Sequence, residues 1–597
     1  MQYWACRYKK YIMILFSIVF LTIYLGWSGS KVTEKSIVGM QLITNDELRE
    51  KLAGKTKENS RPVLMYEEMS CAYDTEKNTF FIPQNLDTNV YEGKLYTEKG
   101  KWKLFLLEDD MQKNKQQAIE SGLAFTLYLI GKESYYECQV TFTGAPILMI
   151  QTVEEENRQV DHNGRIIYHG EVSLVDPYRS ATTVVKEACS YHIRGGSSEF
   201  YEKSNYKLEL NEKKSLLGMQ KDDDWVLNSL YDDAGLVHNK VSLELWKRLA
   251  KNNFVANDEG IEGEYVEVFL DQEYRGVYLL MESPDKKSLS LDNQDKLYKC
   301  RADRIPEEHN YTNEYTDDMR PIFLLKYPNE DIPQNWIPLK NWVNVFLKGE
   351  GDTEQAENLL NMENAIDYNL FCLIIGGMDN LRKNVFFVAE LQEDGDYKFK
   401  KIPWDMNATF GNPWVDYEEY NYTLYDPEYY QNVRDWPTDT EILYYLEPER
   451  ISEELYERWC EVREEGVVTE DVLDSMFDKE YTYLYLSGMY KRNYECWPDG
   501  MSAWRDEYVY EYVSKRVPFL DWYFEDLYKS NTTRKIFNGV DYTEEFDPKY
   551  YWDRNYDVLS ELFSYDSTVL LEHYALYGKE FGLQGRKEAG EWNIGMN

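Results

Sequence analysis

The segment DNLRKNVFFVAELQEDGDYKFKKIPWD (379–405) carries the most informative pattern in this chain. Two runs rich in aromatic and β-branched residues are separated by Asp394-Gly395, a dipeptide typical of the tight turn of a β-hairpin. Asn384 precedes the first run, and Asp405 comes directly after the second. The pattern therefore predicts a hairpin whose open end brings Asn384 and Asp405 together.

The residues around this hairpin are those that phosphoryl transfer requires. Asp379 and Asn384 lie five residues apart, the spacing at which one kinase loop holds a catalytic carboxylate and a metal-binding amide. Asp405 would add a carboxylate, and oxygen ligands suit a hard cation such as Mg²⁺. Such spacing is common, however, and most carboxylates of this kind are solvated or cap a turn. We interpret Asp379 as a candidate catalytic base, and Asn384 and Asp405 as candidate metal ligands.

A cation that holds phosphates is expected on an earlier strand. The segment RGGSS (194–198) is small and flexible enough to pass over phosphates, and it leads into a strand that contains Lys203 and Lys207. Residues four apart share one face of a strand, so both lysines would point the same way. The candidates for phosphate binding are therefore Arg194, Ser197, Lys203 and Lys207. A surface strand with solvated lysines is the alternative.

The composition narrows the classes of function. The 597 residues include 66 Lys and Arg against 107 Asp and Glu, a net charge of −41. A nucleic-acid-binding protein needs a basic surface, so we expect no nucleic-acid partner. The sequence contains no GxxxxGK[ST] or GxGxxG loop, no HExxH and no CxxC, which argues against standard nucleotide loops and zinc sites. An acidic chain of this length suits an exported or cell-surface protein.

Positive charge followed by an apolar run marks the N-terminal 30 residues. Arg7, Lys9 and Lys10 precede residues 11–27, which are uncharged and largely apolar, and small residues follow at 28–30. This pattern predicts a secretory signal peptide, with an uncleaved membrane anchor through residues 11–27 as the alternative. Either predicts a protein that acts outside the cell or on its surface. The seven cysteines beyond the leader are odd in number and widely spaced, so no disulfide framework is predicted, although one or two bridges are possible.

Three further regions follow the leader. Residues 31–144 contain short strands separated by turn residues, which predicts a small β-rich domain of unknown role. In residues 145–530 strands come first and helices later, which favours an α+β fold over a doubly wound sheet. Residues 538–593 are rich in Tyr and predict a small helical module. The strands expected are 78–82, 102–107, 137–142, 190–194, 205–209, 265–270 and 276–281, and the helices are 236–250, 365–376 and 453–465.

Five long segments occur in an order that resembles the CotH kinase family, which is named for a bacterial spore-coat protein. They are IRGGSSEFYEKSNYKLEL (193–210), LLGMQKDDDWVLNSLYDDAGLVHNK (216–240), YVEVFLDQEYRGVYLLMES (265–283), GGMDNLRKNVFFV (376–388) and KIPWDMNATFG (401–411). The resemblance implies an atypical protein-kinase-like fold of two lobes. It implies transfer of the γ-phosphate of ATP, with Mg²⁺ or Mn²⁺, to Ser or Thr of secreted, cell-surface or spore-coat proteins. It also implies Lys203 as the ATP lysine, Asp379 as the catalytic base, and Asn384 and Asp405 as metal ligands.

The chain departs from the family pattern at several positions. Gly196 stands where the family has Asn, His238 stands for Arg, and Asn407 stands for Asp in the Trp-Asp-x-Asp element; the lysine pair before the strand reads Lys203-Ser204. Asn can still ligate a metal through its carbonyl, but with less charge. These changes leave a second hypothesis open, a non-catalytic pseudokinase that serves as a cell-surface or coat binding protein.

Two further expectations concern partners. The net charge favours a basic acceptor protein that carries Ser or Thr, whereas transfer to a small molecule, lipid or glycan would use the same residues. The segment 546–586 resembles a repeat found on extracellular proteins of Gram-positive bacteria. A role in surface attachment and a simple helical cap on the preceding domain are both compatible with this resemblance.

Overall fold

The computed structural model describes residues 36–97, 101–108, 114–153, 159–161, 164–179, 184–252, 260–301, 305–307, 310–312, 319–348, 350–381, 383–412, 446, 448–498, 500 and 508–586. Within these ranges no helix combines the length and apolar character needed to cross a membrane. No disulfide links the seven cysteines that lie there. The predicted leader, residues 1–30, lies outside the described part of the chain.

The chain forms two compact units, and the first comprises the described residues up to Cys71, within Val90–Gln112 and within Phe125–Val140. Its elements are β1 (Ser36–Ile37), β2 (Met40–Ile43), α2 (Asn45–Leu52), β3 (Thr56–Lys57), β4 (Leu64–Tyr66), β5 (Met69–Ser70), β8 (Leu95–Thr97), β9 (Lys103–Leu107), β10 (Ala124–Ile130) and β11 (Ser134–Thr143). The strands β1, β2, β9, β10 and β11 are neighbours in that order. Leu48 of α2 packs with Ile43 and Phe105 of this sheet.

The second unit is built on a sheet that closes on itself. Its strands are β12 (Ile147–Thr152), β13 (Gln159–Val160), β14 (Ile166–Val175), β15 (Val184–Arg194), β16 (Asn205–Lys214), β17 (Asp222–Asn228), β18 (Gly263–Leu270) and β19 (Glu273–Glu282). The neighbour order is β12-β18-β19-β17-β16-β15-β14-β13. Closure follows because β12 also pairs with β14.

Alternation of side chains creates two cores around this closed sheet. Tyr206, Leu208 and Leu210 of β16 are buried in the interior with Val266 and Val268 of β18. These are every second residue of their strands, as expected when one face is enclosed. Intervening residues of β17, β18 and β19 pack instead into the larger core that the helices share.

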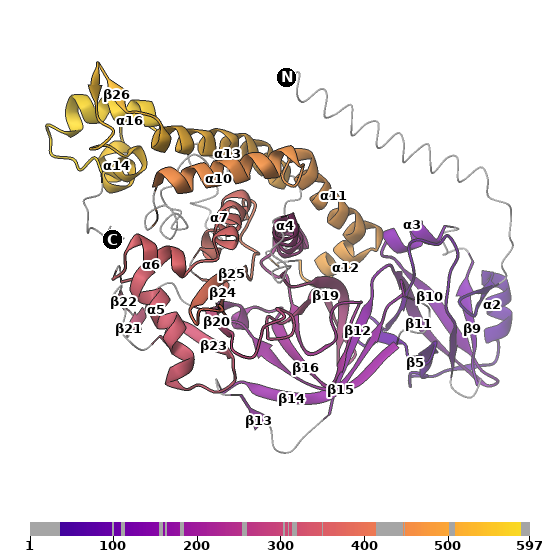
Figure 1. Cartoon of the computed structure of the whole chain (residues 1–597). Helices are drawn as coiled ribbons and strands as arrows, with labels where there is room; N and C mark the ends of the chain where they lie inside the picture. Colours follow the sequence, from indigo (N-terminus) through magenta and orange to yellow (C-terminus); the bar gives the residue numbers. More distant parts are fainter. Residues whose placement is uncertain are drawn as a thin grey trace, which may run out of the picture. The chain divides into compact units, whose positions relative to one another are not determined.

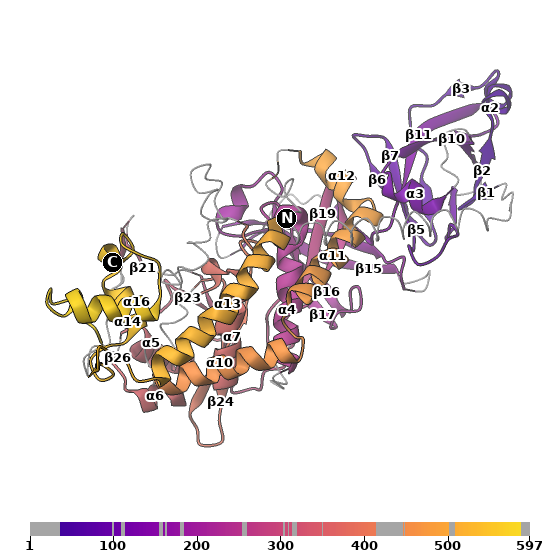
Figure 2. The ribbon, with the colours of Figure 1, turned by 90° about the horizontal axis from the view of Figure 1, so that it is seen from above.

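A second sheet and a group of helices complete this unit (Figure 1). The sheet has the order β23-β20-β24-β25. Its strands are β20 (Lys296–Cys300), β23 (Phe323–Tyr327), β24 (Val385–Leu391) and β25 (Tyr397–Pro403), and β6 (Ala72–Asp74), β7 (Thr79–Pro83), β21 (Ile305–Glu307) and β22 (Asn310–Thr312) also belong to the unit. The helices are α3 (Lys115–Glu120), η2 (Ser197–Phe200), η3 (Ala234–Leu236), α4 (His238–Asn252), η4 (Pro333–Trp336), α5 (Ile337–Phe346), α6 (Thr353–Asn358), α7 (Met362–Ile375), η5 (Met378–Asn380), α10 (Pro448–Glu464), α11 (Glu470–Leu486), α12 (Met489–Cys496) and α13 (Tyr508–Thr532). The central helix α7 contacts α4, α10 and α13 (Figures 1 and 2).

The C-terminal segment forms a cluster of short helices with its own apolar centre. It contains β26 (Ile536–Phe537), β27 (Val540–Asp541), α14 (Pro548–Arg554), α15 (Tyr556–Leu559), α16 (Ser567–His573) and η7 (Tyr574–Gly578). Phe546, Tyr551, Trp552 and Leu570 are buried in this centre. The Ser567 hydroxyl donates to an aspartate of α13, so the cluster is tied to the end of that helix.

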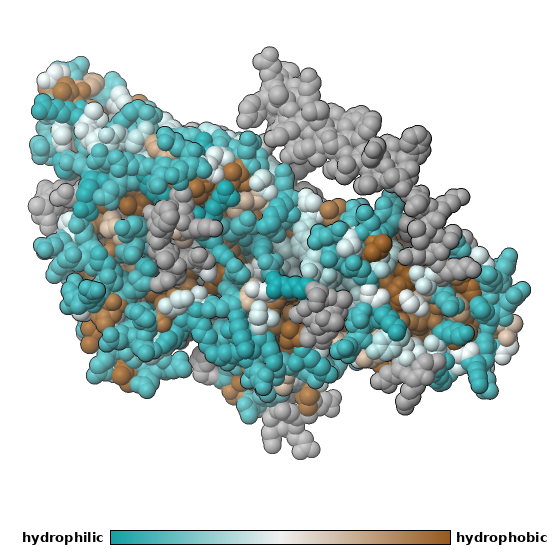
Figure 3. Space-filling model, turned by 45° about the vertical axis from the view of Figure 1, so that its right-hand side comes forward, coloured by the Kyte–Doolittle hydropathy of each residue, from teal (hydrophilic) through white to brown (hydrophobic). Residues whose placement is uncertain are grey.

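The α+β class predicted from the sequence is confirmed, and every strand and helix named from the sequence has a counterpart. Boundaries differ most where the closed sheet extends a strand: residues 190–194 were expected, and β15 covers Val184–Arg194. The antiparallel neighbour β14 pairs with the added residues from Val184 onward, whereas β16 joins only from Cys189. The face drawn in Figure 3 is mostly hydrophilic, in keeping with the acidic composition.

Candidate active site

β24 and β25 form the hairpin that the sequence predicts. The two strands pair antiparallel, with Val385 opposite Pro403 at the open end. Beyond this pair, the Trp404 backbone N–H donates to the Asn384 carbonyl over 2.9 Å. Asp405 is the next residue after Trp404, so the hairpin brings the backbone of Asp405 next to that of Asn384, as expected.

Asp379 lies in η5, directly after α7. The Asn384 amide Nδ2 donates to Asp379 Oδ2 over 2.6 Å. Lys383 Nζ lies 3.2 and 3.5 Å from the two carboxylate oxygens of Asp379. The Asp379 side chain is 21% exposed, so a molecule from solvent can still reach it. The structure therefore joins Asp379 and Asn384 by a direct hydrogen bond.

A buried amide that the sequence did not single out holds the open end of the hairpin. Asn380 Nδ2 donates to the carbonyls of Asn384 and Trp404 over 3.3 and 2.7 Å. The Asn380 carbonyl accepts a hydrogen bond from the Tyr368 hydroxyl of α7 over 2.6 Å. Asn380 thus fixes the separation of the two chain segments that carry the candidate metal ligands. Only its position beside Asp379 could have drawn attention to it.

Both candidate metal ligands have left-handed backbone conformations. The φ angles are 53° for Asn384 and 57° for Asp405. This region costs most L residues about 1–2 kcal/mol, and Asn and Asp visit it more readily than others. Such conformations cluster at functional sites, where the surrounding structure enforces them. The strain at two adjacent positions therefore supports a site at the open end of the hairpin.

The N-terminus of α4 holds the chain on the other side of Asp405. Asn239 Oδ1 accepts from the Met406 backbone N–H over 2.9 Å. Asp233 in turn accepts from the Asn239 backbone and amide and from His238 Nδ1 at 2.8–3.0 Å. The Nε2 atom of His238 lies 2.6 Å from a tyrosine hydroxyl of α13. His238, one of the departures from the family pattern, is thus a fully buried support of the loop that follows Asp405.

Asp232 is an acidic neighbour of Asp405 that the sequence did not reveal. Burial, and to a lesser extent the negative charge of Asp405, raise the pKa of Asp232 to about 7. The Tyr201 hydroxyl donates to Asp232 Oδ2 over 3.2 Å. Carboxylates that repel one another in this way favour the arrival of a cation.

The donor set at the hairpin fits a hard divalent cation. Among the described residues, no three His, Cys, Asp or Glu side chains form a group that could hold a metal by themselves. Asp379 and Asp405 would supply carboxylate oxygens, and Asn384 has Oδ1 available because its hydrogen bond to Asp379 uses Nδ2. Oxygen-only ligands are those that Mg²⁺ and Mn²⁺ prefer.

The structure places Lys203 in a different environment from the one expected. Its side chain is fully buried, and Nζ donates to the Val277 carbonyl over 2.5 Å and to Asn493 Oδ1 over 2.9 Å. Lys203 also precedes β16, which begins at Asn205, so the predicted shared strand face with Lys207 is wrong. The protein itself satisfies this ammonium group, and the structure gives no support to Lys203 as a phosphate ligand.

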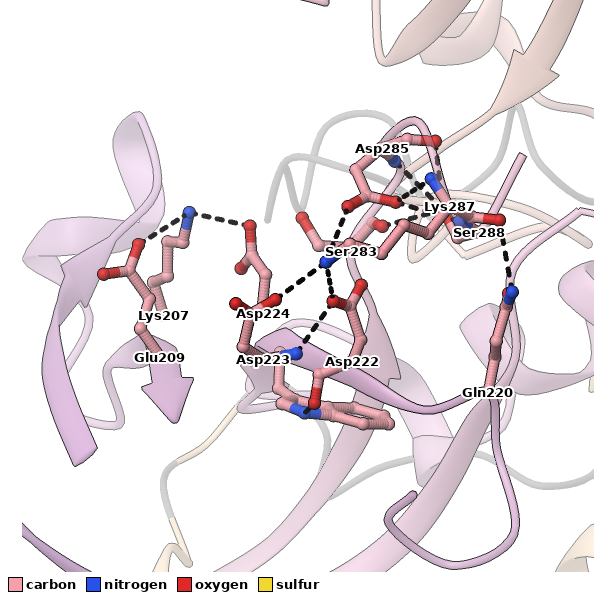
Figure 4. A network of polar contacts seen from close by, with 11 residues as sticks. Lys207, Glu209, Gln220, Asp222, Asp223, Asp224, Ser283, Asp285, Lys287 and Ser288 are labelled. Atoms are coloured by element: carbon pink, nitrogen blue, oxygen red, sulfur yellow. Dashed lines mark hydrogen bonds and ion pairs between the residues drawn. The ribbon is translucent and has the colours of Figure 1, made fainter. Parts of the chain in front are cut away.

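Lys207 is also neutralised by the protein. Its Nζ lies 3.0 Å from Asp224 and 3.1 Å from Glu209, as Figure 4 shows. These carboxylates raise the pKa of Lys207 although burial opposes them. Ser197 begins η2, the short helix that follows the glycine pair.

Arg194 is the predicted phosphate ligand that lies next to the hairpin. Its guanidinium carbon is 5.3 Å from the centre of the Trp404 ring, on the residue before Asp405. Lys299 of β20 lies over the same ring at 5.6 Å. The sequence did not identify Lys299, because it is separated from Arg194 by more than 100 residues and lies in none of the motifs described above. The structure thus brings two cations from distant strands beside the candidate metal ligand.

Residues 191–520 match the model of a family described as CotH kinase protein. No curated protein matches the chain. The family match includes Arg194, the hairpin and all three candidate oxygen ligands, and it covers more than half of the sequence. The chain therefore belongs to the CotH kinase family.

Proposed function

We propose that this protein is an exported, ATP-dependent kinase that phosphorylates Ser or Thr of a secreted, cell-surface or spore-coat protein. The observation that supports this most is the convergence of Asp379, Asn384 and the chain at Asp405 at one end of the β24–β25 hairpin. A kinase-like, two-lobed architecture is part of the proposal. In it, the closed sheet would be one lobe, and β20, β23–β25 and the helices would be the other.

Asp379 has the surroundings of a catalytic base. Lys383 and the Asn384 amide both donate to its carboxylate, which favours the ionised form that accepts a proton. In the reaction, the acceptor oxygen forms a bond to the γ-phosphorus, and the bond from this phosphorus to the β,γ-bridging oxygen breaks. The hydroxyl proton passes to Asp379, and ADP leaves.

Asp405 and Asn384 would hold a divalent cation, which neutralises phosphate charge when bound. Their positions depend on contacts made by protein alone. Asn380 holds both chain segments, and Asn239 holds the residue that follows Asp405. This pre-organisation reduces the rearrangement needed when substrate binds.

We further propose an extracellular or surface location and a basic acceptor. The leader and the net charge of −41 support these points. An acidic protein attracts a basic partner over several ångströms at low salt. Equal phosphorylation rates of Lys-rich and Glu-rich peptides at low ionic strength would remove the preference for a basic acceptor.

The decisive experiment measures transfer of the γ-phosphate by the full chain with Mg²⁺ or Mn²⁺. Asp379→Asn and Asp405→Asn should each lower the rate by about 10²–10⁴-fold, because each removes a charge used in the transition state. Asp396→Asn, a matched change at the exposed turn of the same hairpin, should leave the rate within about twofold. Transfer that persists in both site variants would show that the activity comes from a contaminant.

A non-catalytic binding function is the second candidate. Asn407 replaces a carboxylate beside Asp405, which lowers the negative charge available to a cation. ATP binding by the wild type without transfer to any protein, small-molecule, lipid or glycan acceptor would favour this function.

A further inference from the structure

Arg194 and Lys299 lie over the Trp404 ring, and Lys326 lies on the strand that pairs with that of Lys299. Arg194 ends β15, Lys299 lies in β20 and Lys326 lies in β23. All three side chains are partly buried. Within the described residues, none of the three makes a side-chain hydrogen bond or an ion pair.

These cations are close enough to repel one another. Burial, followed by the charges of Arg194 and Lys326, lowers the pKa of Lys299 to about 7, although Asp405 opposes the shift. Burial and the charges of Lys207 and Arg194 also lower the pKa of Lys326, although the charge of Asp224 opposes the shift. Partly buried charges that repel one another destabilise a fold unless an opposite charge arrives.

Two neighbouring lysines are neutralised by carboxylates of the protein itself. Figure 4 shows Lys207 between Glu209 and Asp224, and Lys287 in contact with Asp222 and Asp223. Each of these lysines is matched by at least two carboxylates, as the acidic composition readily allows. Within the described residues, Arg194, Lys299 and Lys326 differ from these lysines because they lack such partners and also repel one another.

Two of the three cations lie beside the open end of the β24–β25 hairpin. Arg194 and Lys299 share the ring of Trp404, the residue before Asp405. Asp405 also acts electrostatically on both of them. A polyanion that contacts Arg194 and Lys299 would thus lie beside the carboxylate that is a candidate metal ligand.

We propose that Arg194, Lys299 and Lys326 form an anion site that binds the polyphosphate of a nucleoside triphosphate. The assignment rests on the proposed kinase function and deepens it, since it moves phosphate binding from Lys203 to residues of β15, β20 and β23. Lys203 remains an internal residue that links the chain before β16 to β19 and α12.

Calorimetric titration of the full chain with ATP, and separately with inorganic tripolyphosphate, both with Mg²⁺, tests this site without requiring turnover. Lys299→Met and Lys326→Met should each weaken ATP binding at least tenfold, and tripolyphosphate binding by a similar factor. Lys299→Arg should restore most of the affinity because it keeps the charge. Lys398→Met, a control on β25 with no hydrogen bond or ion pair among the described residues, should change affinity less than twofold.

The outcomes separate this inference from the proposed function. Unchanged ATP affinity in Lys299→Met and Lys326→Met, with cooperative unfolding and no loss of stability, would overturn the anion site even if transfer is intact. A wild type that binds neither probe would also overturn it. Binding that depends on these lysines, in a protein that transfers no phosphate, would support the anion site and contradict the kinase function.

Discussion

Two groups of cations in the second unit differ in whether the described residues accept hydrogen bonds from them. At the first, which we call the α12 anchor, Arg492 Nε lies 2.7 Å from Glu267, and Lys203 is held by Asn493 and the Val277 carbonyl. At the anion site, defined above by Arg194, Lys299 and Lys326, no described residue accepts from the cations. The comparison indicates that protein groups hold the first set of cations, whereas the second is the set that we propose binds a ligand.

The largest effect is expected from breaking the anchor. Arg492→Met leaves the fully buried Glu267 carboxylate without its ion-pair partner and should lower the free energy of unfolding by about 3–5 kcal/mol. Urea denaturation measures the change. The double variant Arg492→Met/Glu267→Gln should recover much of the loss, and a single variant as stable as wild type would contradict the structural role of the anchor.

At the anion site, loss of a cation is expected to raise the free energy of unfolding. Without ligand, Lys299→Met removes a partly buried cation for which the described residues offer no acceptor, and the free energy of unfolding should rise by about 1–2 kcal/mol. Methionine keeps an apolar side chain of similar length while it removes the ammonium group that lies over the Trp404 ring. Thermal unfolding without nucleotide gives the sign, and a clear loss of stability would show that Lys299 has a structural partner after all.

A smaller effect should appear in the pH dependence of stability. Burial, with a contribution from Arg275 and against the charge of Cys496, lowers the pKa of Lys203 to about 7. Between this value and the ordinary lysine pKa, the unfolded chain binds a proton that the folded protein has released, so stability rises with pH. From pH 7.5 to 8.5, wild type should gain about 1 kcal/mol relative to Lys203→Met. Parallel curves for the two proteins would contradict the lowered pKa.

The local sequence was sufficient to predict those parts of the structure in which the contacting residues are close together along the chain. The hairpin follows from Asp394-Gly395 and the alternating residues around it, and its register brings Trp404 to Asn384. The hydrogen bond between Asn384 and Asp379 likewise joins residues only five apart. These parts of the candidate site were predictable because few other pairings were available to the chain.

Local sequence failed where a partner lies far away. Lys203 seemed to belong to the strand of Lys207, but β16 begins two residues later. Its actual acceptors include Asn493, which is 290 residues distant. Lys299 and Lys326 carry no motif, and only their approach to Arg194 gives them a role.

The sequence by itself determined the α+β class, the hairpin and the family, because short-range periodicity, turn chemistry and the order of long segments are properties of the chain. The tertiary structure alone decided which cations are neutralised and which are not. That outcome depends on closure of the sheet and on the packing of α12, which set the distances between charges from separate strands.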